Sequence, residues 1–361
     1  MNKNYYAIIM AGGIGSRFWP ISRTSHPKQF IDILGTGKTL IQNTYDRFLK
    51  ICPKENIYVV TNEIYTDLVK KQLPDMADDQ ILTEPVMRNT APCIAYGSFR
   101  IESMNPDAAI VVAPSDHLIL DEAAFVSAIE KSLKVATENN CLITLGIKPS
   151  RPDTGYGYIQ YTDNSLENDF YKVKTFTEKP TLEIAKTFLQ SGDFLWNAGI
   201  FVWSARAIVH AFNQYLPDMH EIFADSRPVY NTPEERNHIH KTYQQCTNIS
   251  IDYGIMEKAN NVYVLPSEFG WSDLGTWASI YELAEKDYVG NAVIPAEKVI
   301  MYDSSNCMVN VPGEKLVILQ GLHDFIVVEA NNTLLICPRD QEQNVKKVVA
   351  DVKQQFGTKY I

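Results

Sequence analysis

The stretch from Ala11 to Lys28, AGGIGSRFWPISRTSHPK, constrains this chain more than any other. It follows a short apolar run, residues 5–10, which predicts a buried first strand. Glycines here allow positive φ angles and let backbone N–H groups approach a ligand, which is how loops wrap around phosphate oxygens. The glycines are Gly12, Gly13 and Gly15, and the cations that follow them are Arg17 and Lys28. The sequence therefore predicts a strand that runs into a phosphate-binding loop.

Two better-known glycine-rich loops fit this stretch poorly. A Walker A loop needs Lys-Ser or Lys-Thr directly after its last glycine, and neither pair follows the glycines here. A dinucleotide-binding fingerprint needs a third glycine where Phe18 stands and a helix that begins at once, whereas Pro20 and Pro27 keep this segment irregular. From the motif alone, a glycine-rich surface loop with two incidental cations stays open.

Composition excludes several classes of protein. With 361 residues, 45% hydrophobic and 21% charged, the chain is long enough for one large globular domain and a smaller one. A formal net charge of -10 argues against nucleic acid as a partner, and any anionic substrate then needs locally concentrated cations. No apolar run approaches the ~20 residues of a membrane span and no signal peptide is visible, so we expect a cytoplasmic protein without membrane contact. The six cysteines contain no C-x-x-C pair, which favours buried, reduced thiols.

From residue 40 to about 284, apolar strands alternate with helical patterns, which predicts a Rossmann-like α/β domain with a mainly parallel sheet covered by helices on both faces. Expected strands are 57–60, 80–82, 109–112, 142–145, 157–161, 173–176 and 199–203, and expected helices are 40–51, 63–72, 92–104, 122–137 and 182–190. The section 205–248 is helical in pattern but harder to interpret. Its His238 and His240 would point to different faces of a helix, which favours surface residues over metal ligands.

Near residues 285–295 the composition changes from helical to strand-rich, which predicts a large domain of residues 1–285 and a smaller domain of residues 286–361. Turn signals recur at short intervals in the smaller domain, so we expect an all-β unit. It ends in an amphipathic helix with one apolar face, made of Val345, Val348, Val349, Val352 and Phe356. No hexapeptide repeat is visible, so a role in packing or subunit contact is expected in place of acyl transfer.

In such sheets ligands lie beyond the carboxyl ends of the strands, so the segments that follow strands carry most weight. The segment 84–92, EPVMRNTAP, joins a strand to a helix, with Thr90 as the expected N-cap and Pro92 in the first turn. A purely structural connection explains these two residues but not the remaining polar set, which is Glu84, Arg88 and Asn89.

Two aspartates are expected on loops from distant parts of the sequence. Asp116 comes after Ser115 and a very apolar strand, and alone it is equally well explained as the cap of a turn. Asp273, in GWSDLGTW, changes that balance, because Mg²⁺ prefers one or two carboxylates together with waters and substrate phosphates.

Three further segments would build a sugar-phosphate site. The segment 153–158 offers Tyr156 and Gly157, the segment 176–180 offers a carboxylate beside a cation in Glu178 and Lys179, and the segment 196–199 offers Asn197 and Gly199. Each segment alone is also explained as an ordinary turn or a solvated ion pair. Asp252 is explained as a residue that starts a helix, and equally well as a match to the family pattern described below.

The opening pattern G-x-G-x-R-x-x-P followed by Pro-Lys resembles the signature of sugar-1-phosphate nucleotidylyltransferases. Its extension Pro27-Lys28-Gln29-Phe30 resembles the mannose-1-phosphate guanylyltransferase branch, and the later segments resemble the same family over essentially the whole chain. The resemblance implies a nucleotidyltransferase domain with a β-helix-like C-terminal domain. Implied nucleotide-binding residues are Ala11, Gly12, Gly13, Gly15, Ser16, Glu84, Arg88, Asn89 and Ser115. Implied sugar-phosphate-binding residues are Tyr156, Gly157, Glu178, Lys179, Asn197 and Gly199.

The implied reaction is attack by a phosphate oxygen of mannose 1-phosphate on the α-phosphorus of GTP, which gives GDP-mannose and pyrophosphate. The nucleophile is already an anion, so no general base is needed, and catalysis is mostly positioning and charge neutralisation. The implied catalytic residues are Arg17 for the leaving pyrophosphate, Lys28 for the α-phosphate, and Asp116 and Asp273 for Mg²⁺, while Lys179 would hold the sugar phosphate. We also expect a homodimer and, from the length of the sequence, an enzyme without a fused isomerase domain.

Some alternatives stay open. Another hexose or heptose 1-phosphate could replace mannose 1-phosphate, and a non-catalytic nucleotide-sugar-binding regulatory protein would share the fold. An oxidoreductase would need the missing third glycine and an acidic residue on the ribose. Guanine has adjacent donors at N1–H and the exocyclic amine, which a carboxylate can accept together, so Glu84 is the candidate base reader. Glu84 is also explained as a surface residue that ends a strand, or as a partner of Arg88.

Overall fold

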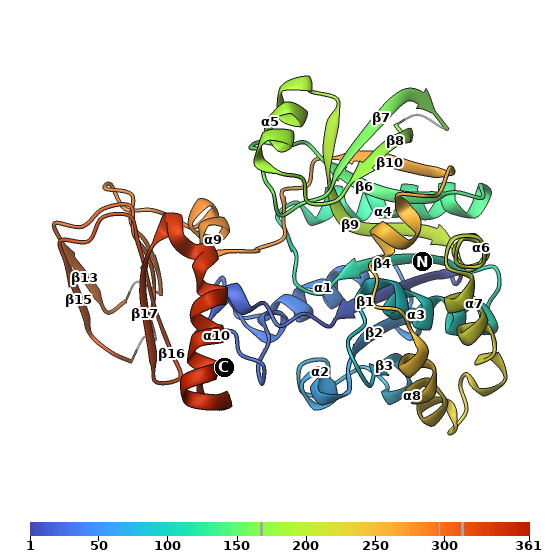
Figure 1. Ribbon diagram of the computed structural model, residues 1–361, viewed down its shortest axis with the longest axis horizontal. Coiled ribbons are helices and arrows are strands. Elements are labelled where there is room, and N and C mark those ends of the chain that lie inside the picture. Colours follow the sequence, from blue (N-terminus) through green and yellow to red (C-terminus); the bar gives the residue numbers. More distant parts are fainter. Residues whose placement is uncertain (167–168, 296, 312–313) are drawn as a thin grey trace. The chain divides into compact units, whose positions relative to one another are not determined.

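The computed structural model describes residues 1–166, 169–295, 297–311 and 314–361 (Figure 1). The described residues form two compact groups. The first, here called the sheet unit, comprises Met1–Gly12, Thr44–Ser115 and Ile119–Trp271; the second, the β-helix unit, comprises Gly13–Asn43, Asp116–Leu118 and Ser272–Ile361. This division follows contacts and not chain order, and the boundary expected at residue 285 stays a prediction.

The sheet unit is built on a nine-stranded sheet in the order β3-β2-β1-β4-β9-β6-β10-β8-β7. Its strands are β1 (Tyr5–Ala11), β2 (Ile57–Asn62), β3 (Ile81–Glu84), β4 (Ala109–Pro114), β6 (Leu142–Ile147), β7 (Tyr158–Ser165), β8 (Tyr171–Thr177), β9 (Phe194–Ser204) and β10 (Val262–Ser267). The neighbours β3, β2, β1 and β4 are parallel, as are β6 and β10, whereas β9 runs antiparallel to both β4 and β6. The strand β8 also runs antiparallel to both β10 and β7. The expected α/β fold is confirmed, but the expectation of a mainly parallel sheet is wrong, because β9, β8 and β7 run antiparallel to their neighbours.

Helices pack around this sheet (Figure 1). They are α1 (Leu40–Phe48), α2 (Thr66–Gln72), α3 (Thr90–Met104), α4 (Glu122–Glu138), α5 (Leu182–Ser191), α6 (Ala205–Tyr215), α7 (Pro217–Ala224) and α8 (Glu235–Gln245). The section that was hard to interpret thus forms α6, α7 and α8. Aromatic rings join three of these helices, since Phe99 of α3 contacts Phe212 of α6 and Phe223 of α7. His238 and His240 lie on α8, where His240 Nε2 is 3.1 Å from Glu63 Oε2.

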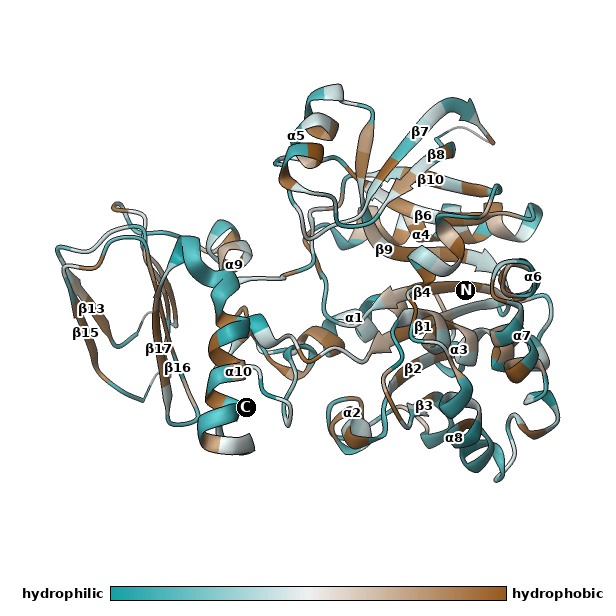
Figure 2. Ribbon diagram, viewed as in Figure 1, coloured by the Kyte–Doolittle hydropathy of each residue, from teal (hydrophilic) through white to brown (hydrophobic). Residues whose placement is uncertain are grey.

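Central strands are apolar without alternation because both faces are covered (Figure 2). In β1 the residues 7–9 are fully buried, and so are residues 110–112 of β4. This burial explains why the sequence shows these strands as continuous apolar runs and why their positions were predictable. Two short strands, β5 (Leu118–Ile119) and β11 (Trp271–Ser272), lie where the chain passes from one unit to the other.

The C-terminal strands alternate between two small sheets. One sheet contains β12 (Ala292–Ile294), β14 (Met308–Asn310), β16 (Phe325–Ala330) and β17 (Thr333–Pro338), and the other contains β13 (Val299–Tyr302) and β15 (Val317–Gln320). Ala292 pairs in parallel with Met308, and Met308 with Ile326, so successive coils stack; β17 then turns back antiparallel on β16. Small apolar residues such as Cys307, Val309 and Val327 fill the interior. The expected β-helix-like domain is confirmed.

The β-helix unit also contains α9 (Trp277–Leu283) and ends with α10 (Val345–Phe356). Polar and apolar residues alternate along α10 (Figure 2), and its valines, Val345, Val348, Val349 and Val352, pack against Trp19 and Leu335. Phe356, at the end of the same helix, does not pack in this cluster: its side chain is 61% exposed, and its ring meets Tyr360 edge-on. The valine stripe ends one turn earlier, at Val352.

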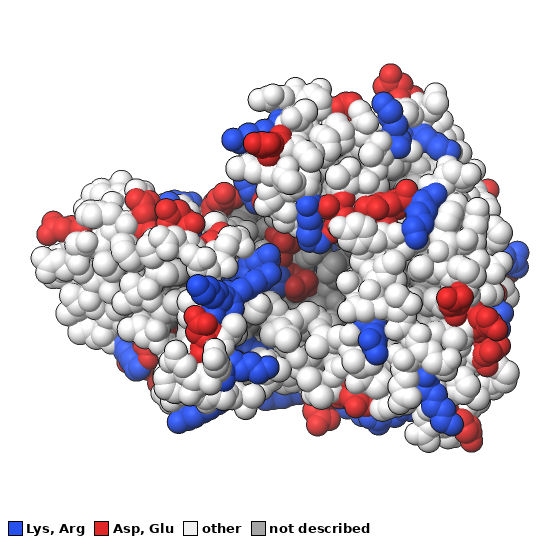
Figure 3. Space-filling model, in the orientation of Figure 1, with Lys and Arg blue, Asp and Glu red and all other residues white. Residues whose placement is uncertain are grey.

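All six cysteines are free thiols, and only Cys337 is not fully buried. Among the described residues, no helix combines the length and the apolar character that crossing a membrane requires. On the face drawn in Figure 3, lysines and arginines are interspersed with acidic residues and most of the area is uncharged. That face carries no broad basic surface of the kind that binds nucleic acid.

Candidate active site

Within the sheet unit, β1, β2 and β3 end at one edge. Ala11 pairs with Thr61, and the next residue of β2, Asn62, pairs with Glu84. The Thr61 hydroxyl donates a hydrogen bond of 2.8 Å to the Ala11 carbonyl, which fixes the end of β1. A Cβ atom placed on Gly12 would lie 3.8 Å from Glu84 Oε2. The acidic residue of the candidate base-reading loop therefore lies beside the first glycine of the opening loop.

Glu84 is buried, with only 3% of its surface exposed, so its interpretation as a surface residue is wrong. The Tyr243 hydroxyl, from α8, donates a hydrogen bond of 2.9 Å to Glu84 Oε1. Burial raises the pKa of the Glu84 carboxyl to about 7, while the bond from Tyr243 acts in the opposite direction. Sequence reasoning missed Tyr243, because nothing in the pattern of α8 distinguishes it from an ordinary core tyrosine.

The loop after Glu84 leads into α3. Asn89 has a positive φ of 70° and is the N-cap, because its side chain accepts a bond of 2.9 Å from the Thr90 amide. The expectation that Thr90 is the N-cap is wrong by one residue, since both residue types cap helices well. The Thr90 hydroxyl instead accepts a bond of 2.9 Å from the Ile251 amide. Pro92 lies in the first turn as expected, and Arg88 Nε is buried without an acceptor among the described residues.

The rest of the opening loop belongs to the β-helix unit, and one of its glycines is required by geometry. Gly15 has a φ of +66°, and a Cβ atom there would lie 2.4 Å from the Lys28 Cβ. A side chain at this position is therefore excluded by both conformation and space. Gly13 differs, because no atom lies within 4 Å of the position that its Cβ would occupy. That side of the loop is open to an approaching group.

Lys28 contacts both of the segments that carry the candidate metal ligands, inside the β-helix unit. Its Nζ lies 2.8 Å from Asp116 Oδ2 and donates bonds of 2.8 and 3.1 Å to the carbonyls of Asp273 and Leu274. Lys28 is 4% exposed, so this cation is held in place by its neighbours. Burial alone would raise the pKa of the Asp116 carboxyl, but the charges of Lys28 and His117 outweigh it and hold that pKa below its usual value.

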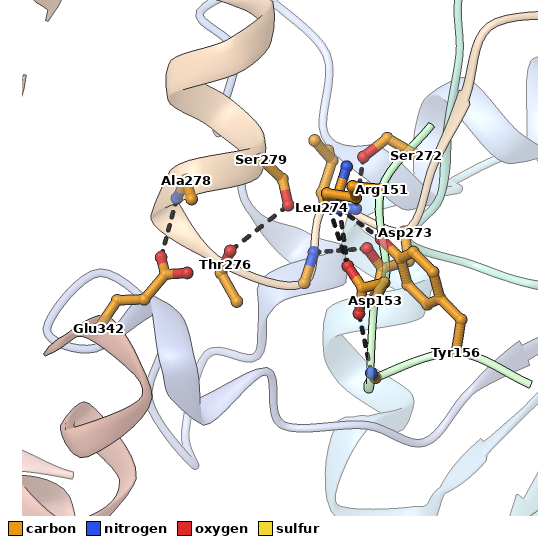
Figure 4. A network of polar contacts seen from close by, with 12 residues as sticks. Arg151, Asp153, Tyr156, Ser272, Asp273, Leu274, Thr276, Ala278, Ser279 and Glu342 are labelled. Atoms are coloured by element: carbon orange, nitrogen blue, oxygen red, sulfur yellow. Dashed lines mark hydrogen bonds and ion pairs between the residues drawn. The ribbon is translucent and has the colours of Figure 1, made fainter. Parts of the chain in front are cut away.

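Asp273 lies on the segment that leads into α9 (Figure 4). Its Oδ1 accepts a bond of 2.9 Å from the Gly275 amide, and the Leu274 amide bonds to Ser272 Oγ at 3.1 Å. Farther along, the Ala278 amide in the first turn of α9 donates a bond of 2.8 Å to Glu342 Oε2 (Figure 4). These contacts fix the loop that carries Asp273.

The donor atoms of this cluster suit Mg²⁺, which prefers carboxylate oxygens. No group of three or more His, Cys, Asp or Glu side chains that could hold a metal occurs in residues 1–166, 169–295, 297–311 and 314–361. The pair Asp116 and Asp273 would thus supply only part of a coordination sphere. The remaining ligands would come from water and phosphate oxygens, which is the usual arrangement for Mg²⁺ at phosphate-transfer sites.

Arg17 lies in a short 3₁₀ helix, Ser16–Phe18, directly after Gly15. Its Nε is buried and has no acceptor in the part of the chain that the structure describes. A buried N–H group of a charged side chain is unfavourable without a partner, and a bound anion would supply one. Phe18 anchors this turn by contacting the ring of Trp277 edge-on at 5.2 Å.

The candidate sugar-binding residues gather in the sheet unit around Asn197. This residue was expected before a strand that starts at 199, but β9 begins at Phe194 and contains it. Its Nδ2 donates a bond of 2.9 Å to Asp252 Oδ1, and its Oδ1 accepts bonds from Thr144 Oγ1 at 2.9 Å and the Gly199 amide at 3.2 Å. Burial, together with the charge of Glu178, raises the pKa of Asp252 to about 6. Thr144 carried no signal in the sequence.

Gly157, Glu178 and Asn197 are in close contact. A Cβ atom on Gly157 would lie 2.5 Å from Glu178 Oε2 and 3.4 Å from the Asn197 Cβ, so a larger residue would displace the carboxylate. Lys179 forms an ion pair with Glu178 and has a positive φ of 47°. The structure thus brings together three residues that the sequence placed in three separate segments.

Tyr156 packs edge-on against Trp196 at 5.0 Å and Trp271 at 5.2 Å. Beside it, Arg151 pairs with Asp153 at 2.9 Å, and Asp153 Oδ1 accepts a bond of 2.8 Å from the Gly155 amide (Figure 4). These contacts order the turn that precedes Gly157. At the end of β4, Ser115 is buried, and its amide donates a bond of 2.9 Å to the Met10 carbonyl of β1.

The fold and these side chains define a nucleotidyltransferase. A family model described as nucleotidyl transferase matches residues 6–289, and one described as a MannoseP isomerase/GMP-like beta-helix domain matches residues 297–352. The mannose-1-phosphate guanylyltransferase of Salmonella montevideo is 36% identical over 356 residues, which are 96% of this chain and 73% of that protein. The alginate biosynthesis protein AlgA of Pseudomonas aeruginosa is 34% identical over 96% of this chain and 72% of its own length.

A crystal structure described as mannose-1-phosphate geranyltransferase from Thermus thermophilus has a TM-score of 0.86 and 29% identity, and the match covers 97% of this chain and 99% of that one. This chain belongs to the mannose-1-phosphate guanylyltransferase family, within the nucleotidyltransferases.

Proposed function

We propose that the protein transfers GMP from GTP to mannose 1-phosphate and releases GDP-mannose and pyrophosphate. The observation that carries this proposal is the cluster in which buried Lys28 contacts the Asp116 carboxylate and the backbone carbonyl of Asp273. These are the residues to which the family resemblance assigns the phosphate and metal roles. The name of the relative from Salmonella montevideo, mannose-1-phosphate guanylyltransferase, supports the choice of mannose 1-phosphate and of a guanine nucleotide as substrates.

The chemistry requires little beyond positioning and charge. The phosphate oxygen of mannose 1-phosphate is already a nucleophile, and the obstacle is repulsion between two anionic substrates. Arg17, whose buried Nε has no acceptor among the described residues, would bind the leaving pyrophosphate. Lys28 would neutralise charge at the α-phosphate, and Lys179 would hold the incoming sugar phosphate.

A divalent metal fits this scheme. Asp116 and Asp273 would hold Mg²⁺, which when bound neutralises phosphate oxygens as the bond to pyrophosphate breaks. The contact of Lys28 with Asp116 keeps that carboxylate ionised, as a metal ligand must be.

For the base, we propose that Glu84 accepts the N1–H and exocyclic amine of guanine. Tyr243 holds Glu84 Oε1, which leaves the carboxylate in one orientation. Adenine presents an acceptor at N1 and would face the carboxylate with repelling lone pairs. Arg88 Nε, a buried donor without an acceptor in the described ranges, and Asn89 lie on the same loop and are further candidates for nucleotide contacts.

For the sugar, we propose that Glu178 and Asn197 bind hydroxyl groups. The Asn197 amide is held by Thr144 and Asp252, so its orientation is set before any ligand binds. Gly157 has no side chain, so the Glu178 carboxylate can occupy the space beside it. We also propose that the protein acts as a homodimer, which light scattering of the purified chain would test. Its place in the cytoplasm stays a prediction.

Pyrophosphate release over a panel of nucleoside triphosphates and sugar 1-phosphates tests this function. We expect the highest kcat/KM with GTP and mannose 1-phosphate, and no release after removal of divalent metal with EDTA. Highest activity with another hexose or heptose 1-phosphate would change the proposed sugar substrate but leave the proposed type of reaction unchanged. Tight binding of GDP-mannose without pyrophosphate release from any pair would instead indicate a nucleotide-sugar-binding regulatory protein.

A further inference from the structure

A single arginine ties the opening loop to the C-terminal strands inside the β-helix unit. Arg23 Nη2 donates bonds to the Asn331 carbonyl at 2.9 Å, to Thr333 Oγ1 at 3.0 Å and to the Ala330 carbonyl at 3.4 Å. Its Nη1 reaches the Lys359 carbonyl at 3.4 Å. One guanidinium thus contacts the turn between β16 and β17 and the end of the chain.

The turn that accepts these bonds is built to present carbonyl groups. Ala330 and Thr333 are paired across β16 and β17, and the two residues between them, Asn331 and Asn332, have positive φ angles of 50° and 61°. Two consecutive residues of this kind form the tight type I′ turn of a β-hairpin, for which asparagine is well suited. A tight turn of this kind holds its carbonyl groups in a fixed direction, and the planar fork of an arginine matches several such acceptors at once.

On the loop side, Arg23 lies in the segment that joins Gly15 to Lys28. The backbone groups of Arg23 and His26 bond to each other at 3.0 and 3.1 Å, which closes the turn that leads into Pro27 and Lys28. On the other side, the Ser22 hydroxyl donates a bond of 2.6 Å to the Gly15 carbonyl. A shift of Arg23 would therefore disturb the turn that leads into Lys28 and the contact of the neighbouring Ser22 with Gly15.

A second contact supports the same attachment. Trp19 Nε1 donates a bond of 2.7 Å to the Tyr360 carbonyl. The Trp19 ring is buried in the cluster that contains Leu335 of β17 and Val345 of α10. The segment between Gly15 and Lys28 is thus attached to the C-terminal strands and helix through both a polar and an apolar contact.

We propose that Arg23 is a positioning residue for the transfer reaction, because it fixes the phosphate-binding loop on the β16–β17 turn and so makes the C-terminal β-helix responsible for the position of Lys28. The catalytic part of this inference rests on the proposed function. The structural part, that Arg23 orders the loop, does not. Arg23 itself contacts no reacting group in this scheme.

Arg23→Ala and Arg23→Lys test the proposal, with Arg339→Gln as the matched control. Arg339 is an arginine of the same β-helix, and it bonds to Asp324 at 3.1 Å and lies over the Tyr281 ring at 3.8 Å. We expect both Arg23 variants to lower kcat at least tenfold, because a lysine ammonium cannot reproduce the fork. Arg339→Gln should keep the wild-type kcat. Millimolar guanidinium ion should restore part of the activity of Arg23→Ala and should not raise that of Arg339→Gln. A kcat within twofold of the wild-type value in Arg23→Ala would overturn the proposal.

Hydrogen exchange gives a readout that does not depend on activity. Amides of residues 14–30 should exchange at least tenfold faster in Arg23→Ala than in the wild type, and at the wild-type rate in Arg339→Gln. Unchanged exchange in Arg23→Ala would overturn the ordering role even if kcat falls. Should the wild type release no pyrophosphate from any substrate pair, the proposed function fails, while this exchange experiment still tests the attachment of the loop.

Thr333→Val covers the case in which Arg23→Ala does not fold. The substitution removes one acceptor of Arg23 and keeps the shape of the side chain. We expect a kcat reduced about threefold and faster exchange confined to residues 14–30 and the β16–β17 turn. Wild-type kcat together with wild-type exchange in Thr333→Val would contradict the proposal. If Arg23→Ala folds, adding Thr333→Val to it should not lower kcat further. A further loss of kcat in the double variant would contradict the proposal that the two residues act through one contact.

Discussion

The burial of Glu84 makes a prediction about stability that needs no substrate. The carboxyl has an ordinary pKa of 4.5 and a pKa of about 7 in the folded protein, chiefly because burial disfavours the charged form. The folded state therefore binds the proton more tightly than the unfolded chain does. The contribution of Glu84 to the free energy of unfolding should be highest below pH 4.5, and it should fall as the pH rises to 7.

The size of the effect follows from the shift. A difference of about 2.5 pH units corresponds to about 3 kcal/mol, because each unit is worth 1.36 kcal/mol. Glu84→Gln removes the titrating group and keeps the shape and a hydrogen-bond acceptor for Tyr243. The stability of the wild type relative to Glu84→Gln should therefore decrease by about 3 kcal/mol between pH 4.5 and pH 8.

Urea unfolding of both proteins across this pH range, followed by tryptophan fluorescence, measures the difference directly. Other groups that titrate contribute equally to both proteins and cancel. Tyr243→Phe is the companion variant: it removes the hydrogen bond that lowers the pKa of Glu84, so the fall in stability should move to higher pH. If wild type and Glu84→Gln depend on pH in the same way, the carboxyl is not held in a desolvating site and the reasoning is refuted.

Three further predictions concern the phosphate loop and the metal. Lys28→Ala and Arg17→Ala should each reduce kcat by a factor on the order of 10², measured as pyrophosphate release, and near-normal turnover would remove that residue from the mechanism. Asp273→Asn should raise the Mg²⁺ concentration for half-maximal rate several-fold, and an unchanged Mg²⁺ dependence would argue against the two-carboxylate site. Gly15→Ala should lower the free energy of unfolding by about 2 kcal/mol or more, whereas Gly13→Ala should change it by no more than about 0.5 kcal/mol; equal effects in chemical unfolding would contradict the assigned loop geometry.

Much of the sheet could be predicted because its strands are buried on both faces. The runs that contain Ile8 and Val111 are continuous in the sequence for that reason, and strand ends then indicate where ligand groups lie. The same reasoning placed Asp116 at the end of a strand, and the structure brings it to Lys28. Helix ends were less certain, because Asn89 and Thr90 are both good N-caps and only the backbone decides between them.

The sequence could not indicate which residues from distant segments form hydrogen bonds with the site residues. Tyr243 is 159 residues from Glu84 in the sequence, and its hydroxyl bonds to the Glu84 carboxylate. The residues near Glu84 in the sequence therefore do not indicate that its carboxylate is buried. Thr144 and Asp252 hold the Asn197 amide in the same way, from β6 and from the short π-helix Asp252–Met256. Such contacts depend on how helices and strands pack, and a local pattern of residue types carries no information about them.

The division of the opening loop between the two units has a consequence for exchanging parts between related proteins. Gly12 belongs to the sheet unit, while Gly13–Asn43 belong with Ser272–Ile361. A chimera that takes its C-terminal strands from a relative would pair a foreign β16–β17 turn with the native Arg23 and Trp19. Residues 13–43 should therefore be exchanged together with residues 272–361, although the two segments lie far apart in the sequence.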